Sequence, residues 1–443
     1  VKPFLPGDEV LFDGSSRIEV VIRRVLAMSE EDVAETLHAT RSDFADRHRG
    51  FDDVLEENFD LVARRFRVPE DLSAGRRLLI GAYFTHEYAV EGAALGNPSI
   101  VVAPDQAGLA AGEVRFVMSL RAIGEGHISS IEFRSGVIGD DSSVALNEPT
   151  ACIATGRRAD AEYDKKFFTT KLSELGVLND VARMALRDLG TTFTMVELES
   201  AIRGLDERGI DRTRSLETAH TLHWLASSNY RISFDPKSDL SERVIFPGGP
   251  TESHGMEDVR LVRFVHEDGT VVYYGTYTAF DGHQILPQLL ETTDFMSFRI
   301  STLTGRCAQN KGIALFPRKL GGRFYALGRH DNVNNFLMNS DDVRVWYDTE
   351  RIQEPERPWE LMQLGNCGSP LETEAGWLVI THGVGPMRQY SLGALLLDLD
   401  DPARVIGHLK EPLLVPDADE REGYVPNVVY SGGSMIHGCL LYT

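Results

Sequence analysis

The C-terminal half of the chain repeats one short pattern four times. Each copy has a polar start, a short run of β-forming residues, a turn that contains glycine and a second apolar run. The copies start near Asp258, Gly312, Pro370 and Pro426, at intervals of 54, 58 and 56 residues. Repeated strand-rich units of this length are typical of propeller blades, because a single blade cannot bury its apolar face alone. The spacing therefore predicts a ring of small sheets.

A fifth copy precedes these four after a long gap. Asn97 and Pro98 lead into an apolar run, and the next apolar run ends at Arg121. The 160 residues from Pro98 to Asp258 correspond to one blade plus an insertion of about a hundred residues. Five copies predict a mainly β fold, a five-bladed β-propeller.

Two segments outside the repeats have helical periodicity. Ser29 and Asp32 form a candidate capping box in the first segment, and Thr194 with Glu197 forms one in the second. The predicted organisation is an N-terminal helical region over residues 1–80, the first blade over 81–140, a helical insertion over 141–224 and the other blades over 225–443. The apolar faces of these helices are either core or a surface for a homo-oligomer.

The repeat also predicts where a site lies. In a propeller the innermost strand of every blade runs along the central channel, so equivalent positions of different blades meet at one end of it. Four of these positions carry polar side chains: Asn97, Asp258, Lys311 and Ser369. An amide, a carboxylate, an ammonium and a hydroxyl group around a concave opening suit a polyhydroxylated or anionic ligand.

Asp258 lies in the run from Gly255 to Arg260, which leads into a strand. Arg260 is two residues further on, so both side chains face the same side of a strand and the cation favours the ionised carboxylate. An ion pair with a purely structural role has the same pattern. The repetition of polar residues at equivalent positions favours a functional site over that alternative.

Composition excludes several kinds of partner. The 67 acidic and 45 basic residues give a net charge of −22 without a basic stripe, which argues against nucleic acid and against an anionic membrane. Four cysteines without CxxC spacing, no apolar run of membrane-spanning length and no signal-peptide layout predict a cytoplasmic protein, although Val1 is not a methionine and a leader could have been removed. The thirteen histidines have no metal-binding spacing and no dinucleotide motif occurs, so no metal or cofactor is expected.

An ordered set of motifs resembles glycoside hydrolase family 130, the β-mannoside phosphorylases and β-mannosidases, which are five-bladed propellers. The resemblance covers residues 85–135 and 225–443 and leaves both helical segments outside the family pattern. The motifs are Asn97-Pro98, Arg121, Gly255 to Arg260, Thr293-Asp294-Phe295, Lys311 with Ala314 to Pro317, Gly376-Trp377 with His382 to Val384, Leu396 to Pro402, and Glu422 to Val429. The family usually continues through one or two further strands, so either the sequence is truncated or another segment completes the last blade.

The resemblance implies an inverting enzyme that cleaves β-mannosidic linkages of manno-oligosaccharides. It implies that Asp258 is the general acid, whose proton reaches the glycosidic oxygen through the 3-hydroxyl of the bound mannose. The positions expected to contact substrate are Asn97, Arg121, Glu257, Arg260 and Ser369, of which the first two match positions that hold the mannose. Protonation near neutrality requires a raised pKa for Asp258; the like charge of Glu257 acts in that direction, and Arg260 opposes it.

Hydrolysis and phosphorolysis differ in the second reactant. Phosphate must be held by charge-assisted hydrogen bonds, and Lys311, Arg329 and His382 are candidates for holding it. Against this, Gly328 replaces a histidine that often precedes this arginine in the family, and Glu291 stands where some phosphorylases have an arginine. A carboxylate repels phosphate and can activate water, so Glu291 is a candidate general base, or else an ordinary solvated carboxylate at a strand end. The balance slightly favours hydrolysis. The alternatives are phosphorolysis to mannose 1-phosphate, with inorganic phosphate as co-substrate, and a non-catalytic carbohydrate-binding propeller.

Overall fold

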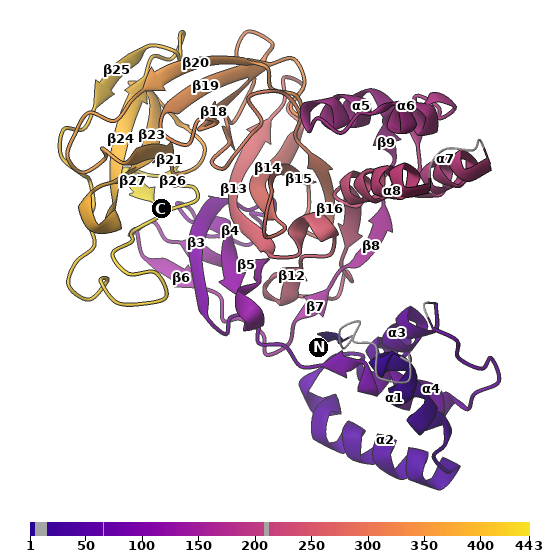
Figure 1. Cartoon of the computed structure of the whole chain (residues 1–443). Coiled ribbons are helices and arrows are strands. Elements are labelled where there is room, and N and C mark those ends of the chain that lie inside the picture. Colours follow the sequence, from indigo (N-terminus) through magenta and orange to yellow (C-terminus); the bar gives the residue numbers. More distant parts are fainter. Residues whose placement is uncertain (5–15, 65, 208–211) are drawn as a thin grey trace. The chain divides into compact units, whose positions relative to one another are not determined.

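The computed structural model describes the chain except for residues 5–15, 65 and 208–211 (Figure 1). Contacts divide the chain into two units. One comprises Val1–Val90 with Thr150–Ala154, and the other comprises Glu91–Pro149 with Thr155–Thr443. The sequence placed the end of the helical region at residue 80; its last helix ends at Tyr83, and the contact unit continues to Val90. No described helix is both long and apolar enough to cross a membrane.

Four helices make up most of the first unit. They are α1 (Arg17–Leu26), α2 (Glu30–Phe44), α3 (Phe51–Ala63) and α4 (Ala74–Tyr83), with one turn of 3-10 helix at Ala45–Arg47 and a ribbon of β1 (Lys2–Pro3) with β2 (Thr85–His86). A capping box begins α2 at the predicted pair, Ser29 and Asp32. The apolar faces meet in a core of nearly inaccessible side chains, among them Ile22, Val62 and Ile80.

Antiparallel strands dominate the second unit (Figure 1). They form a 12-stranded sheet, a four-stranded sheet, a five-stranded sheet and a C-terminal hairpin, and we divide the largest sheet where β5 meets β13, which gives five groups along the chain. The first group is β3 (Ala94–Val102), β4 (Val114–Ile123), β5 (Ser129–Ile138) and β6 (Val144–Leu146). The second is β13 (Gly255–Val265), β14 (Val271–Phe280), β15 (Ile285–Thr292) and β16 (Ser297–Thr302). The third is β17 (Ala314–Leu315), β18 (Phe324–Gly328), β19 (Asn335–Ser340) and β20 (Asp348–Gln353). The fourth is β21 (Gln363–Asn366), β22 (Leu371–Thr373), β23 (Gly376–Val384), β24 (Tyr390–Leu397) and β25 (Val405–His408), and the fifth is the hairpin of β26 (Met435–His437) and β27 (Leu440–Tyr442).

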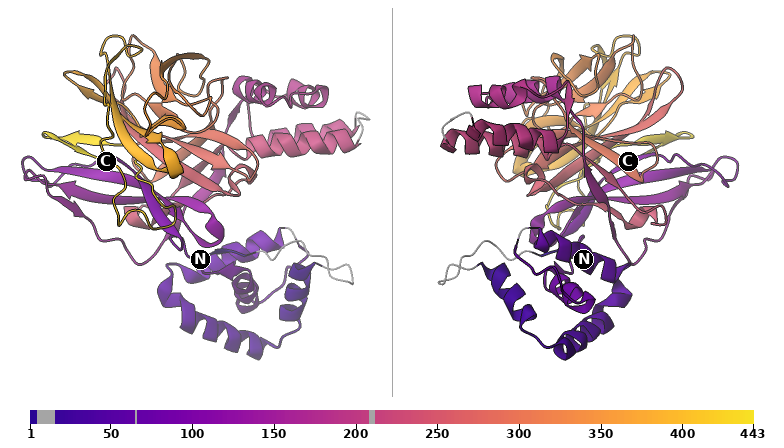
Figure 2. Two further views of the ribbon diagram at one scale, coloured as in Figure 1. Left: turned by 60° about the vertical axis from the view of Figure 1, so that its left-hand side comes forward. Right: turned by 90° about the vertical axis from the view of Figure 1, so that its right-hand side faces the viewer.

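The predicted helical insertion contains strands as well as helices. Its helices are α5 (Lys165–Glu174), α6 (Asp180–Arg187), α7 (Met195–Glu207) and α8 (Arg212–Ala226), which share one apolar core and project from the edge of the second group (Figure 2). Thr194 and Glu197 exchange hydrogen bonds at the start of α7, as predicted. The predicted insertion also contains β7 (Ala154–Thr155), β8 (Arg157–Asp160), β9 (Tyr163–Asp164) and β10 (Thr192–Phe193), and it is followed by β11 (Tyr230–Ser233) and β12 (Arg243–Ile245). Strands β11 and β8 extend the second group beyond β16, so residues 141–224 are not wholly helical.

Apolar side chains fill the spaces between successive strand groups. Phe264 of the second group and Leu315 of the third share one core, and Leu327 of the third shares another with Trp377 of the fourth. Two further clusters connect the remaining groups, one with Ile380 and Val429 and one with Phe116 and Met435. The first group also pairs with the second, where Ser129 of β5 lies beside Gly255 of β13. Every group therefore contacts the next one, and the last group contacts the first.

Candidate active site

Each strand group has left-handed backbone in or before one of its strands. Asn97 has a φ of 53° and Asp258 a φ of 56°, and each lies where the register of its strand shifts. Such bulges re-aim a side chain, and Asn, Asp and Gly are the residues that adopt this conformation most readily. The corresponding places in the other three groups are Gly312 (φ 90°), Gly368 (φ 105°) and Asn427 (φ 62°).

Asp258 is the centre of a polar network between three strand groups. Its Oδ1 accepts a hydrogen bond from Asn97 Nδ2 at 2.5 Å and from Arg121 Nη1 at 3.4 Å. Arg121 Nη2 donates to Glu257 at 2.9 Å, and Lys311 Nζ donates to the other oxygen of Glu257. The structure thus brings together five of the side chains that the sequence singled out, although they are separated by up to 214 residues along the chain.

Two arginines, the buried Arg260 and the partly buried Arg329, lie next to this network. Arg260 donates to the hydroxyl of Tyr430 and, over 3.3 Å, to the backbone oxygen of Asp258. Arg329 donates to the backbone oxygen of Leu364 over 3.3 Å. Neither guanidinium forms a salt bridge with any described residue, and each has a buried Nε without a hydrogen-bond partner. Burial lowers the pKa of Arg329, and the neighbouring charge of Arg260 acts in the same direction.

His382 lies beside these arginines as a neutral ring. Its Nε2 is 3.5 Å from Arg329 Nη1, and its Nδ1 is 3.6 Å from the Sγ of Cys367. Burial and the charges of Arg329 and Arg260 hold the pKa of His382 well below its ordinary value. The imidazole therefore acts here as a hydrogen-bonding group and not as a cation.

The charge balance around Asp258 differs from the one that the sequence suggested. Burial raises the pKa of this carboxyl group, but Arg121, Arg260, Lys311 and the amide of Asn97 together outweigh burial and bring the pKa below its ordinary value. The raised pKa that a proton donor needs near neutrality is therefore not provided by the side chains around Asp258. Counting Glu257 against Arg260 was insufficient because Arg121 and Lys311 come from other strand groups.

Glu291 is not part of this cluster. It lies on β15 opposite Tyr274, which lies opposite Val262 of β13. Two strand spacings and four residues along the strand separate it from Asp258, a distance of about 16 Å. The carboxyl groups of the acid and base of an inverting glycosidase stand about 6.5–9.5 Å apart, so this backbone separation argues against Glu291 as the general base. Its carboxylate instead lies 3.9 Å from Arg299.

One further predicted residue, Ser369, and three residues that the sequence did not predict lie among or near these groups. The hydroxyl of Ser369 is buried without a hydrogen-bond partner, and no contact links it to Asp258 among the described residues. Tyr430 and Cys367 contact the arginine and histidine side chains, and Asn366 Nδ2 donates to the backbone oxygen of Gly312 over 2.5 Å. Tyr430 could have been found, because it follows Asn427 in the fifth repeat much as Arg260 follows Asp258 in the second. Among the described residues, no group of three or more His, Cys, Asp or Glu side chains could hold a metal ion.

Comparison with known proteins identifies relatives of the C-terminal part. The family model of glycoside hydrolase family 130, described as beta-1,4-mannooligosaccharide phosphorylase, matches residues 225–442. A 1,2-beta-oligomannan phosphorylase of Thermoanaerobacter sp. is 36% identical over 43% of this chain and 64% of its own length. A beta-1,2-mannobiose phosphorylase of Listeria innocua is 30% identical over 45% of this chain and 56% of its own length. The chain therefore spans less than two thirds of the length of these two relatives.

The match to a third relative is more extensive. A beta-1,2-mannobiose phosphorylase of Thermoanaerobacter sp. is 35% identical over 48% of this chain and 70% of its own length. The solved structure of the Listeria innocua enzyme with beta-1,2-mannobiose aligns with 80% of this chain and 86% of its own at 22% identity, with a TM-score of 0.44. The sequence matches, rather than this structural alignment, show that the chain belongs to glycoside hydrolase family 130.

Proposed function

We propose that the chain catalyses the phosphorolysis of β-mannosides with inversion and releases α-mannose 1-phosphate. The observation that carries the proposal is the pair Arg260 and Arg329. Arg260 is buried and Arg329 is partly buried, neither forms a salt bridge with a described residue, and each has a buried Nε without a hydrogen-bond partner. Buried cations without a partner cost free energy, which an anion bound beside them would offset. Phosphate suits this role because its oxygens accept paired hydrogen bonds from arginine.

The relatives support the same reaction. The three curated relatives described above are all named as phosphorylases, each acting on β-1,2-linked mannosides. This favours phosphorolysis over the hydrolysis that the sequence slightly favoured. The position of Glu291 agrees with that change, because a carboxylate about 16 Å from Asp258 is too distant to activate water for the same glycosidic bond.

The network supplies each step of the reaction. Asn97 and Arg121 orient the mannose, and Arg260, Arg329 and Lys311 hold the phosphate on the face of C1 opposite the leaving group. A phosphate oxygen forms the new bond to C1 while the C1–O bond to the leaving sugar breaks. The leaving oxygen takes a proton that originates on Asp258, by way of the 3-hydroxyl of the mannose. The products are α-mannose 1-phosphate and a saccharide shorter by one mannose.

Phosphate binding would also prepare the acid. Despite the opposing effect of burial, the surrounding cations hold the pKa of Asp258 below its ordinary value. A dianion beside Arg260 and Arg329 offsets these cations and raises the pKa of Asp258 toward the value that a proton donor needs. Protonation of the acid thereby depends on the presence of the nucleophile.

We further propose that the five strand groups are the blades of a five-bladed propeller around this site. Two observations support a closed ring: each group shares an apolar core or a strand pairing with the next, and Ser99 of the first group pairs with Gly433 of the last. Gly432 N also donates to the backbone oxygen of Pro98 over 2.7 Å. In such a ring, the innermost strands carry Asn97, Asp258 and Lys311 to one end of the channel.

The experiment incubates the chain with β-1,2- and β-1,4-mannobiose, each with and without inorganic phosphate. We expect mannose 1-phosphate and free mannose in equal amounts, and only when phosphate is present. Mannose released at the same rate without phosphate would overturn the proposal in favour of hydrolysis. Binding of mannobiose without any turnover would support the carbohydrate-binding alternative.

A pair of variants links the reaction to the proposed phosphate site. Arg329→Gln should lose phosphate-dependent turnover, while Arg263→Gln, which changes an exposed residue of the same strand as Asp258, should keep it. Equal loss in both variants would indicate a general effect of removing positive charge and would contradict a specific role for Arg329.

A further inference from the structure

A second group of arginines lies on the outermost strands of the second strand group. Arg231 of β11 is directly opposite Arg299 of β16, and Arg157 of the edge strand β8 is two residues from Ala159, which is opposite Arg231 on the other side. Residues that pair directly across strands face the same side of a sheet, and so do residues two apart on one strand. The three arginines therefore share one face, here called the arginine face.

These cations are exposed and largely unpaired. Neither Arg157 nor Arg231 forms a salt bridge with any described residue, and Arg299 has one distant partner, Glu291, at 3.9 Å. Like charges directly opposite each other on neighbouring strands destabilise a sheet. Three of them together stand out in a chain with a net charge of −22, and a bound anion would offset the repulsion that water leaves unscreened.

Hydrogen-bond donors of a second kind surround the arginines. Ser233 and Ser297 are opposite each other, and Ser233 is also opposite Arg157, so both hydroxyls lie on the arginine face. Ala159 leaves room beside Arg231 because its side chain is a single methyl group. The face lines a groove of about 580 Å³, and Glu291, directly opposite Arg299 on β15, is the one carboxylate among the described residues that line it. Three guanidinium groups and two hydroxyl groups in one groove are a suitable set of donors for the oxygens of a phosphoryl group.

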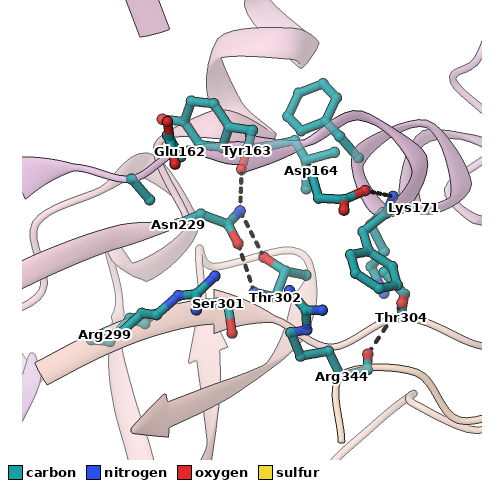
Figure 3. A pocket seen from close by; sticks show the side chains of 15 residues that line it. Glu162, Tyr163, Asp164, Lys171, Asn229, Arg299, Ser301, Thr302, Thr304 and Arg344 are labelled. Atoms are coloured by element: carbon teal, nitrogen blue, oxygen red, sulfur yellow. Dashed lines mark hydrogen bonds between the residues drawn. The ribbon is translucent and has the colours of Figure 1, made fainter. Parts of the chain in front are cut away.

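The groove adjoins a cavity beneath the helical insertion. Arg299 lines both, and the cavity continues past Ser301 and Asn229 to Asp164 and Lys171 (Figure 3). Ser301 is buried, and its hydroxyl has no hydrogen-bond partner. A buried polar group without a partner costs free energy, so this end of the site also has unused capacity to bind a ligand.

We propose that the arginine face binds a phosphoryl group, either as inorganic phosphate or as a phosphate monoester. An extended polyanion fits less well, because the cations occupy only three adjacent strands, a span of about 10 Å. The site is separate from the Asp258 cluster: β14 and β15 lie between β13 and β16, which places Arg299 three strand spacings, or about 14 Å, from the innermost strand. It is therefore a second phosphoryl site that the proposed reaction does not use.

Calorimetric titration with inorganic phosphate and, separately, with mannose 6-phosphate tests the proposal. We expect two binding sites for phosphoryl groups, the Asp258 cluster and the arginine face. In the double variant Arg231→Gln/Arg299→Gln, the affinity of the arginine face for at least one of the two probes should fall at least tenfold. The control Arg203→Gln changes another exposed arginine, whose side chain is 69% accessible on α7, and should bind both probes like the parent chain. Whichever probe loses affinity in the double variant identifies whether free phosphate or a monoester is the ligand.

Two further measurements distinguish this inference from the proposed function. Arg260→Gln/Arg329→Gln removes the phosphate site of the reaction and should leave binding at the arginine face intact. If that variant abolishes all phosphoryl binding, or if Arg231→Gln/Arg299→Gln changes no affinity by more than twofold, the arginine face is not a phosphoryl site. Loss of turnover in Arg260→Gln/Arg329→Gln concerns the proposed reaction alone.

Thermal unfolding separates ligand binding from a structural role. Without phosphate, Arg231→Gln/Arg299→Gln should unfold at the same temperature as the parent chain or about 1 °C higher, because a like-charge pair is removed. Saturating phosphate should raise the unfolding temperature of the parent chain, and it should raise that of the double variant by less. A variant that is less stable without ligand would show that the arginines stabilise the sheet, and would overturn the proposal.

Discussion

The Asp258 cluster and the arginine face both concentrate positive charge, but they differ in burial. In the cluster, Arg260 is almost inaccessible, and Asp258 titrates below its ordinary pKa under the influence of the surrounding cations. On the arginine face, Arg231 and Arg299 are exposed to water, which screens their repulsion. The charge of an arginine side chain therefore has a large effect on neighbouring groups in the Asp258 cluster and a small effect on the arginine face. Substitutions at the two sites should differ in their effects accordingly.

The largest effect is expected for the acid itself. Asp258→Asn keeps the size of the side chain and a residue type that tolerates the left-handed backbone, but it cannot donate the proton. We expect turnover to fall by about 10²- to 10⁴-fold, the usual contribution of a general acid. Binding of mannobiose, measured by calorimetry, should persist.

The exposed Asp341→Asn serves as a control, because its side chain is 87% accessible and lies on another strand group. Turnover of Asp258→Asn within tenfold of the parent chain would exclude this aspartate as the acid.

The next largest effect concerns the buried guanidinium group. Arg329→Gln should reduce kcat/KM for phosphate by about 10²- to 10³-fold, as expected when a charged donor to a reacting group is removed. Arg231→Gln should change the same quantity by less than about twofold, because its charge is screened. Steady-state kinetics with phosphate varied at fixed mannobiose measure both. Similar losses of kcat/KM in Arg329→Gln and Arg231→Gln would contradict the conclusion that only the Asp258 cluster holds the reacting phosphate.

A smaller effect should appear in the pH dependence of folding. The pKa of His382 is well below its ordinary value in the folded chain, so between these two values the unfolded chain binds a proton that the folded chain does not. Stability should therefore fall as pH decreases below about 6.5, with a contribution from this residue of up to about 1.4 kcal/mol per pH unit.

Urea unfolding of the parent chain and of His382→Gln at several pH values checks this contribution. The variant should have a shallower slope below pH 6.5 whatever its stability at neutral pH. Parallel slopes would show that the histidine titrates normally in the folded chain.

The smallest effect is expected at the arginine face without ligand. Removing one of two opposed charges with Arg231→Gln should change the free energy of unfolding by about 0.2–1 kcal/mol in the stabilising direction, and high salt should diminish the difference. Urea unfolding at low and high ionic strength measures it. A destabilisation that salt does not affect would mean that Arg231 packs against the sheet through its aliphatic part.

The sequence predicted the features that depend on repetition. Asn97 and Asp258 occur at equivalent places of the repeat, Lys311 directly precedes the equivalent Gly312, and the structure joins the three polar side chains in one network. Capping pairs such as Ser29 and Asp32 were predictable because their hydrogen bonds span three residues.

Features that depend on pairing across long separations were not predictable. Arg157, Arg231 and Arg299 belong to no repeat, and only the order β16, β11, β8 puts them on one face. Glu291 was assigned to the site because of its neighbours in the sequence, which do not reveal how far along β15 it lies from Asp258. The pKa of Asp258 depends on Arg121 and Lys311, whose distances from it no local pattern encodes.

The left-handed backbone at Asn97 and Asp258 has a consequence for how this family can change. A β-branched or bulky side chain is strained in that conformation, which leaves asparagine, aspartate and glycine as the residues of lowest cost. Random libraries at the two positions should therefore yield folded protein mainly with an amide, a carboxylate or no side chain at all. The shape of the main chain would thus limit the chemistry available at both positions before any selection for activity begins.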